Sequence, residues 1–272
     1  NKLSLQKEIS KDNCLSFVPT MGGLHKGHLS LIKKAKKYKY KICVSIFVNP
    51  TQFNKKIDFK KYPRSLVSDI KALKKLQIDY LYLPTYKDIY SFETKNKIYV
   101  DKFSKQLCGK YRKGHFEGVL NVVNRFVEII KPKYIFLGIK DFQQLILINK
   151  HIQKNKIKTK VIECKTIREK NGVACSTRNF NLNRKELTIA SNIYKYLLNL
   201  NKKIKKNYKL FKINTIKKDI FLLGASKIDY IEYLNIRKFN NNKKSKDKIR
   251  LFFAYYITVS YTHLRAHETR HD

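Results

Sequence analysis

The 272 residues, 43% of them hydrophobic, are enough for one large or two modest domains with sizeable cores. No uncharged apolar stretch approaches the roughly 20 residues that a membrane helix needs, and no signal peptide is visible. The formal net charge of +40 is typical of a nucleic-acid-binding protein. Lysines supply nearly all of that charge, however, and they are spread along the chain rather than gathered in one stripe. A solvated surface encoded by an A/T-rich gene explains this pattern better, so we expect neither a nucleic-acid nor a membrane partner.

The cysteines indicate a reducing compartment. The chain contains five of them, far apart and without a CxxC pair, which is typical of free thiols. No Cys/His cluster has the spacing of zinc ligands. We therefore expect a cytoplasmic protein. The five are Cys14, Cys43, Cys108, Cys164 and Cys175.

Over the first 170 residues, short apolar β-branched runs alternate with helical patterns. This alternation predicts a Rossmann-like α/β domain, a parallel sheet with helices on both faces, over residues 1–170. In such sheets ligands bind at the carboxyl ends of the strands. The predicted strands are 15–20, 41–50, 79–84, 134–141 and 159–167, and the predicted helices are 28–38, 62–77, 118–132 and 142–154.

The pattern changes after about residue 180. A helix over 183–200, a Lys/Asn-rich connector with a second helical stretch, and strands over 227–236 and 248–257 predict a smaller α+β domain, residues 180–257. Residues 258–272 read "TVSYTHLRAHETRHD", without lysine. This tail is either a His-rich metal-binding segment or a non-native sequence. The abrupt change of composition favours the second interpretation.

The stretch "TMGGLHKGH" (20–28) follows the first predicted strand. Its glycine pair permits a tight turn, and a helix beginning near Gly27 would direct its N–H groups and its dipole at an anion. His25 and His28 are three residues apart, so both imidazoles would face that site as proton-bearing donors. The alternative is a turn with two incidental surface histidines.

Other polar stretches lie at the ends of predicted strands or in loops that precede helices. Each has an ordinary structural explanation when taken alone, such as a loop-capping Asn, a surface Lys or a helix N-cap, and together they indicate a phosphate and polar-substrate site. They are Asn49 and Gln52 in "NPTQF"; Gly138, Lys140 and Asp141 in "GIKD"; Gln143 and Gln144 after it; Arg112 and His115 before "FEGV"; and Ser176, Thr177 and Arg178 in "STRN".

Taken in order, these stretches closely resemble the pantothenate synthetase (pantoate–β-alanine ligase) family of the HxGH nucleotidyltransferase superfamily. The resemblance covers roughly residues 15–240 and rests on "VPTMGGLHKGHLSLI", "VSIFVNPTQF", "YPR", "GHFEGV", "KDFQQL" and "STRN". It implies ATP-dependent condensation of pantoate with β-alanine through a pantoyl adenylate, with release of pyrophosphate and AMP. It also implies Mg²⁺, a homodimer and a C-terminal domain that acts as a lid.

The resemblance assigns site residues by position. It implies His28, His25, Lys140 and Arg178 as catalytic groups, Gln52, Gln144 and Asn49 as ligands for pantoate or β-alanine, and Asp69 as a weak candidate for placing Mg²⁺. The implied ATP-binding residues are Met21, Gly22, Gly23, Leu24, His25, Lys26, Gly27, His28, Gly138, Ile139, Lys140, Asp141, Ile167, Cys175, Ser176, Thr177 and Arg178.

Two departures from the family pattern lie within this set. The family usually reads GEKD, so Ile139 replaces a carboxylate, and we expect weakened rather than abolished activity. Thr177 stands where Ser is commoner and keeps the hydroxyl. A rival enzyme of the superfamily would transfer a nucleotidyl group to a phosphorylated acceptor. Such an acceptor would demand cations where Gln52 and Gln144 lie.

Overall fold

The computed structural model describes residues 1–12, 14–204, 212–239, 249–257 and 263–264. The chain divides into two compact units, residues 1–166 and 167–272, and each is described by itself. Among the described residues, no helix is long and apolar enough to cross a membrane.

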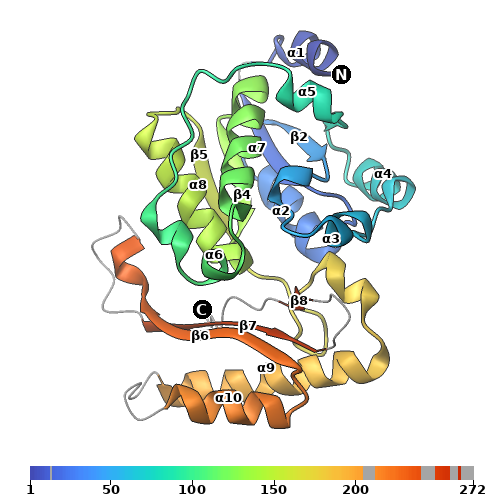
Figure 1. The fold of residues 1–272 in the computed structure, drawn as a ribbon. Coiled ribbons are helices and arrows are strands. Elements are labelled where there is room, and N and C mark those ends of the chain that lie inside the picture. Colours follow the sequence, from blue (N-terminus) through green and yellow to red (C-terminus); the bar gives the residue numbers. More distant parts are fainter. Residues whose placement is uncertain (13, 205–211, 240–248, 258–262, 265–272) are drawn as a thin grey trace. The chain divides into compact units, whose positions relative to one another are not determined.

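Unit 1 contains a five-stranded sheet, in the order β3-β2-β1-β4-β5, with every strand pair parallel (Figure 1). The α/β fold predicted from the alternation of elements is therefore confirmed. The strands are β1 (Leu15–Thr20), β2 (Lys41–Ile46), β3 (Tyr80–Tyr82), β4 (Tyr134–Gly138) and β5 (Lys160–Cys164).

Helices cover both faces of this sheet. On one face, Val18 of β1 and Phe136 of β4 belong to a buried cluster with Ile32 of α2 (Lys26–Lys36) and Leu73 of α4 (Leu66–Lys75). On the other, Phe126 of α7 (His115–Ile130) contacts the rings of Phe17 and Tyr82. Residues 17 and 18 point to opposite sides because side chains alternate along a strand. The remaining helices of the unit are α1 (Lys2–Ile9), α3 (Lys56–Lys60), α5 (Tyr86–Tyr90), α6 (Cys108–Tyr111) and α8 (Phe142–Lys154), with the 3-10 turns η1 (Pro50–Gln52), η2 (Lys102–Lys105) and η3 (Ile139–Asp141).

Several predicted strands end earlier than the apolar runs suggested. β2 stops at Ile46 rather than residue 50, because Asn49 caps the short turn η1. β4 stops at Gly138, because residues 139–141 form η3 and α8 begins directly afterwards. The early strand ends leave the "NPTQF" stretch and residues 139–141 outside the sheet, at its carboxyl edge.

The order of the strands reverses between β1 and β4. Strands β2 and β3 lie on one side of β1, whereas β4 and β5 lie on the other. Thr20 and Gly138, the last residues of two adjacent parallel strands, therefore lie at the same edge of the sheet. Such a switch point is where open α/β sheets bind ligands.

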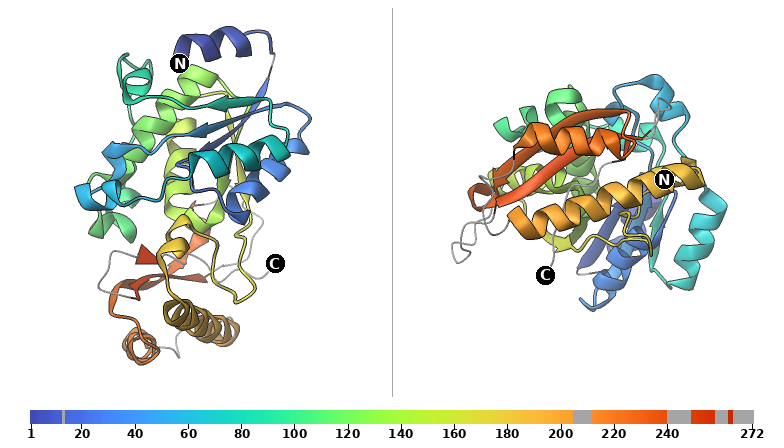
Figure 2. Two further views of the ribbon diagram at one scale, coloured as in Figure 1. Left: turned by 90° about the vertical axis from the view of Figure 1, so that its right-hand side faces the viewer. Right: turned by 90° about the horizontal axis from the view of Figure 1, so that it is seen from below.

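Unit 2 is a small α+β body. An antiparallel sheet in the order β6-β7-β8 is formed by β6 (Lys227–Asn235), β7 (Ile249–Tyr256) and β8 (His263–Leu264). The other elements are η4 (Thr177–Asn181), α9 (Arg184–Ile204), α10 (Ile213–Leu222) and η6 (Ile236–Phe239). Figures 1 and 2 agree that α9 and α10 lie side by side on one face of this sheet. Apart from residues 263 and 264, the predicted non-native tail lies outside the described residues.

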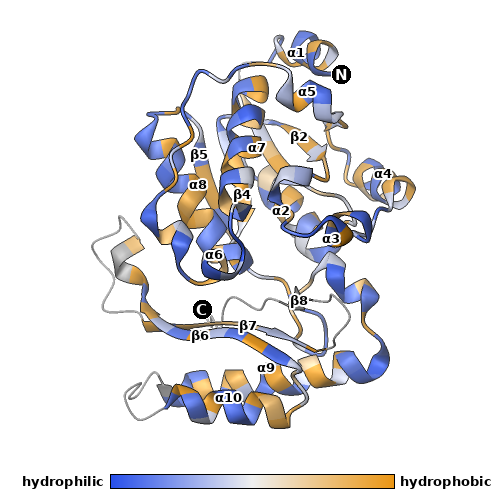
Figure 3. Ribbon diagram, in the orientation of Figure 1, coloured by the Kyte–Doolittle hydropathy of each residue, from blue (hydrophilic) through white to orange (hydrophobic). Residues whose placement is uncertain are grey.

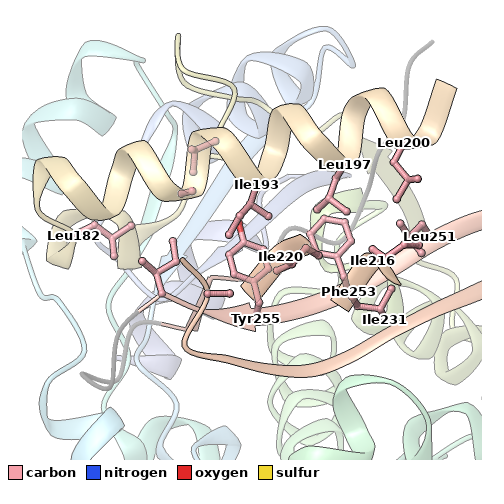
Figure 4. Close-up of a cluster of buried hydrophobic side chains, with 14 residues drawn as sticks. Leu182, Ile193, Leu197, Leu200, Ile216, Ile220, Ile231, Leu251, Phe253 and Tyr255 are labelled. Atoms are coloured by element: carbon pink, nitrogen blue, oxygen red, sulfur yellow. The ribbon is translucent and has the colours of Figure 1, made fainter. Parts of the chain in front are cut away.

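A continuous apolar core joins the helices of unit 2 to its sheet. Ile193 and Leu197 of α9 and Ile220 of α10 pack with Phe253 of β7, and each is 0–1% exposed (Figure 4). Hydrophobic and hydrophilic residues alternate along both helices, as expected for helices with one buried face (Figure 3). Tyr196 also donates a 2.6 Å hydrogen bond to Asp219 Oδ2, which links α9 to α10.

Candidate active site

The turn that follows β1 requires glycine. Gly22 and Gly23 have φ angles of +78° and +61°, in the left-handed region that residues with a side chain rarely adopt. A Cβ atom on Gly22 would lie 3.1 Å from both Asp69 Oδ2 and Ile46 Cγ2. The Thr20 hydroxyl fixes the start of the turn, since it accepts from Gly22 N and donates to the carbonyl of Ser45. The chain thus turns tightly at the end of β1 and enters α2.

Asp69, in the first turn of α4, holds this turn through both carboxylate oxygens. Oδ2 accepts from Gly23 N and Oδ1 from Leu24 N, each at 2.8 Å. Oδ1 also accepts from the Ser65 hydroxyl at 3.0 Å, and Asp69 is only 2% exposed. The amides of Gly23 and Leu24, expected to border ATP, therefore donate to a protein carboxylate. Asp69 is 46 residues from Gly23 and 45 from Leu24 in the sequence, and these contacts were not predicted.

His25 caps α2 with its side chain. Nδ1 accepts from Gly27 N at 3.1 Å, so the proton of a neutral His25 lies on Nε2. The Gly27 amide, expected to face an anion, instead donates to this imidazole. The ring of His28 stacks on that of His25, with centroids 4.0 Å apart and planes at 27°. The spacing of three residues therefore brings the two imidazoles together, and whether both face a phosphate stays a prediction.

His28 is a neutral imidazole near pH 7. Its Nδ1 is buried and, within the described part of the chain, has no hydrogen-bond partner. Burial lowers the pKa of His28 well below 6.5; protonation of His25 and the charge of Lys140 would lower it further, while Asp141 acts in the opposite direction. His28 can therefore donate one N–H, but it does not carry the charge of an imidazolium.

The loop after β4 lies next to the histidines. Lys140 and Asp141 both affect the pKa of His28 electrostatically, as expected for loops at the ends of two adjacent strands. A Cβ atom on Gly138 would meet nothing within 4 Å, so there is open space beside this residue. Ile139, in contrast, is 4% exposed and belongs to the core.

The two glutamines at the start of α8 differ in their surroundings. Gln144 is half-buried, as a residue that contacts substrate can be. Gln143 is 3% exposed, and its amide donates to the carbonyls of Phe103 and Gln106 at 2.7 Å. Gln143 therefore holds the loop around η2, and Gln144 remains the candidate ligand.

The loop after β2 reaches the glycine turn through Gln52. Its Nε2 donates to Met21 Sδ at 3.0 Å, and its Oε1 accepts from Asn49 at 3.2 Å. Asn49 is 1% exposed; it also donates to the carbonyl of Gly118 and accepts from Thr51 N and from the Tyr90 hydroxyl. Asn49, expected to bind substrate, thus has the loop-capping role that the sequence left open, whereas Gln52 is half-buried and its role toward substrate stays a prediction.

Two further residues hold the backbone of Gln52. Its carbonyl oxygen lies 2.7 Å from His115 Nδ1 and accepts from Arg112 Nη2 at 3.3 Å. A carbonyl can only accept, so Nδ1 carries the proton of His115, and Nε2 accepts from Arg112 Nη1 at 3.0 Å. The sequence indicated Arg112 and His115 as candidates, but not that they act on the main chain of Gln52.

The remaining predicted nucleotide residues lie in unit 2. Ile167 and Cys175 are joined by a backbone hydrogen bond of 2.9 Å, and the Ser176 hydroxyl caps η4 by accepting from Arg178 N at 3.3 Å. Thr177 is 4% exposed and Arg178 is half-buried. The contribution of these residues to one site with the histidines stays a prediction.

Comparison with known proteins gives a consistent result. The family model described as "Pantoate-beta-alanine ligase" matches residues 2–266. The chain is 46% identical over 198 residues to the pantothenate synthetase of Flavobacterium psychrophilum, which covers 72% of the chain and 70% of that protein. It is 38% identical over 258 residues to the pantothenate synthetase of Fervidobacterium nodosum, covering 93% of the chain and 91% of that protein.

Solved structures agree with these relatives. The fold is similar to pantoate–β-alanine ligase of Francisella tularensis, a crystal structure described as complexed with β-γ ATP and β-alanine. The TM-score is 0.78 and the identity 39%, over 94% of this chain and 90% of that one. The pantothenate synthetase of Thermus thermophilus gives a TM-score of 0.84 at 26% identity, over 94% of each chain.

Proposed function

The chain belongs to the pantoate–β-alanine ligase family, and from this premise we propose that it joins pantoate to β-alanine with ATP through a pantoyl adenylate. One observation carries the proposal most directly. The stacked pair His25 and His28, at the end of β1, lies within electrostatic range of Lys140 and Asp141, at the end of β4. Donors and a cation thus converge at the switch point of a parallel sheet, where a nucleotide phosphate would bind.

The reaction has two steps. A carboxylate oxygen of pantoate attacks the α-phosphorus of ATP, and the bond to the bridging oxygen breaks, so that pyrophosphate leaves with the electron pair. The amine of β-alanine then attacks the acyl carbon, AMP leaves, and the nitrogen loses a proton as the amide forms. Positioning of the reactants and stabilisation of negative charge on phosphate are sufficient for both steps.

The histidines and Lys140 are proposed to stabilise the α-phosphate. His28 donates its single N–H to a phosphate oxygen as the phosphorus becomes five-coordinate, and His25 Nε2–H is a second donor. Neutral donors keep a full hydrogen bond without the cost of burying another charge, while Lys140 supplies positive charge. This division of roles follows from the lowered pKa of His28.

The side-chain amides of two glutamines are proposed to orient pantoate. Gln52 and Gln144 would hold its hydroxyl and carboxylate oxygens, since an uncharged amide can both donate and accept. Asn49, with Arg112 and His115, would act on Gln52 rather than on the substrate. Ile167 and Cys175 to Arg178 of unit 2 would complete the nucleotide site, with unit 2 as a lid.

Mg²⁺ is proposed to arrive with the phosphates of ATP. Mg²⁺ usually keeps several waters and binds one or two carboxylates together with substrate phosphates. Within the part of the chain that the structure describes, no group of three or more His, Cys, Asp or Glu residues can hold a metal ion. Asp69, the candidate from the sequence, does not fit, because its two oxygens already accept three hydrogen bonds.

The family resemblance also supports a homodimer, and the five free cysteines support a cytoplasmic location. The catalytic proposal is tested by measuring AMP release from ATP with purified protein, with and without pantoate and β-alanine. We expect AMP only when both acids are present in multiple-turnover assays. AMP release by folded protein at the same rate with and without pantoate would overturn the proposal.

A further inference from the structure

We propose that Asp69 is a positioning residue that fixes the glycine turn beneath the histidines, and that it is not a ligand for Mg²⁺. The proposal deepens the function given above and rests on it. Three observations carry it: the contacts of the carboxylate, the conformation of the turn, and the connection from the turn to His25.

Hydrogen bonds occupy three of the roughly four acceptor positions of the buried carboxylate. Each oxygen accepts a main-chain N–H at 2.8 Å, from two consecutive residues, and Oδ1 accepts the Ser65 hydroxyl as well. Hydrogen bonds to an ionised acceptor are roughly twice as strong as neutral ones. At 2% exposure, a metal ion would have to displace these donors to reach either oxygen. That exchange would leave buried N–H groups without acceptors, which is costly.

The turn needs such an acceptor. Gly22 and Gly23 occupy left-handed conformations in succession, so no regular ladder can satisfy the amides that follow. Asp69 Oδ2 lies so close to Gly22 that a Cβ atom there would be 3.1 Å away. The carboxylate and the turn are therefore fitted to each other, and glycine at position 22 makes the approach possible.

The glycine turn also sets the position of the two histidines. Leu24, whose amide Asp69 holds, immediately precedes His25, and His25 both caps α2 and stacks on His28. Loss of the carboxylate would release the segment that fixes the first imidazole. The expected consequence is a slower adenylation step, with no change in how strongly Mg²⁺ activates the enzyme.

The test compares Asp69→Asn with Asp88→Asn. Asp88 is a matched control in unit 1, because its carboxylate also accepts two main-chain amides, those of Thr85 and Lys2, at 2.8 and 3.1 Å. Amide hydrogen exchange of Gly23 and Leu24 is measured without nucleotide. We expect Asp69→Asn to accelerate exchange about tenfold or more, and Asp88→Asn to leave it unchanged. If Asp69→Asn does not fold, Ser65→Ala takes its place. This variant removes one donor to Oδ1, and we expect it to accelerate exchange by a smaller factor.

The second readout is a Mg²⁺ titration of pantoate-dependent AMP formation at saturating ATP. For Asp69→Asn we expect a kcat at least about tenfold lower and a Mg²⁺ activation constant within about twofold of wild type. A tenfold weaker activation constant with rescue by excess Mg²⁺, or unaltered amide exchange, would overturn the proposal. Wild-type protein that forms no AMP would instead contradict the proposed function, and the exchange result would still decide whether Asp69 holds the turn.

Discussion

The imidazole rings of His25 and His28 stack with centroids 4.0 Å apart, and Nδ1 of His25 accepts the amide of Gly27. Two stacked imidazoles in a partly buried position cannot easily both carry a positive charge. The lowered pKa of His28 makes it a neutral N–H donor near pH 7, and we propose that Lys140 supplies the positive charge.

Replacement of His28 by Ala removes the donor with the lowered pKa. The rate of pyrophosphate release from ATP and pantoate should fall about 10²- to 10³-fold, the usual loss for one donor to a developing oxyanion. Thermal unfolding should change only modestly, because the variant loses the ring contact with His25 but no hydrogen bond of Nδ1 within the described residues. Near-normal pyrophosphate release in a folded variant would contradict the role of His28.

Lys140 and Asp141 should shift the pH midpoint of adenylation in opposite directions. A pKa well below 6.5 means that His28 stays neutral as the pH falls through 6.5, so the acid decline of kcat should lie below that pH. Lys140→Gln removes a charge that lowers this pKa and should move the midpoint up. Asp141→Asn removes a charge that raises it and should move the midpoint down. Midpoints are compared rather than plateau rates; shifts in the same direction would exclude this assignment.

The contacts on the Gln52 carbonyl should control pantoate binding. His115→Ala or Arg112→Ala releases the backbone of Gln52 and should raise the KM for pantoate about tenfold, as expected from the loss of a charge-assisted or buried hydrogen bond. The KM for ATP should remain within about twofold. Arg64→Ala is the control, because Arg64 also donates to two backbone carbonyls, of Phe59 and Lys60, but at an exposed position. Equal effects on both KM values would argue for a general structural role.

His151 should make stability fall at acid pH. Its Nδ1 accepts from Tyr99 N, and its Nε2–H donates to Asn124 Oδ1, each at 3.1 Å, with the residue 1% exposed. Burial lowers its pKa below 6.5, against the opposing charge of Glu128. The unfolded chain therefore binds a proton more readily, so the contribution of His151 is present above pH 6.5 and is lost as the pH falls.

Urea unfolding between pH 7 and pH 5 measures this effect. As the pH falls, the free energy of unfolding of the wild type should decrease, and His151 should contribute up to about 1.4 kcal/mol of this decrease per pH unit. His151→Gln, which can still accept and donate, should show a smaller slope. His28 is present in both proteins, so the difference between the slopes isolates His151. Identical slopes would disprove the contribution.

The sequence predicted the parallel sheet, which the structure confirms, and the loops at its carboxyl edge as the place of the site, which stays a prediction. The strands are apolar and β-branched, and the glycine pair marks the tight turn after β1, so local patterns were sufficient there. Strand ends were less well predicted, because Asn49 stops β2 through a side-chain cap, which an apolar run does not reveal.

The contacts that hold the site could not be read from local patterns. Asp69 lies 46 and 45 residues from Gly23 and Leu24, whose amides donate to it, and His115 contacts the Gln52 carbonyl 63 residues away. A carboxylate or an imidazole in a sequence indicates a possible ligand, but only the fold shows that it binds the main chain. The exchange of the family's Glu for Ile139 is also easier to understand in the structure, where this side chain is 4% exposed and contributes to the core.

The central claim is that the pantoate carboxylate attacks the α-phosphorus of ATP. Pantoate labelled with ¹⁸O in its carboxylate, incubated with purified protein, ATP and β-alanine, tests it most directly. We predict one ¹⁸O atom in each AMP formed, because the acyl–oxygen bond breaks when β-alanine attacks the adenylate. AMP without ¹⁸O, or formation of ADP in place of AMP, would contradict the account.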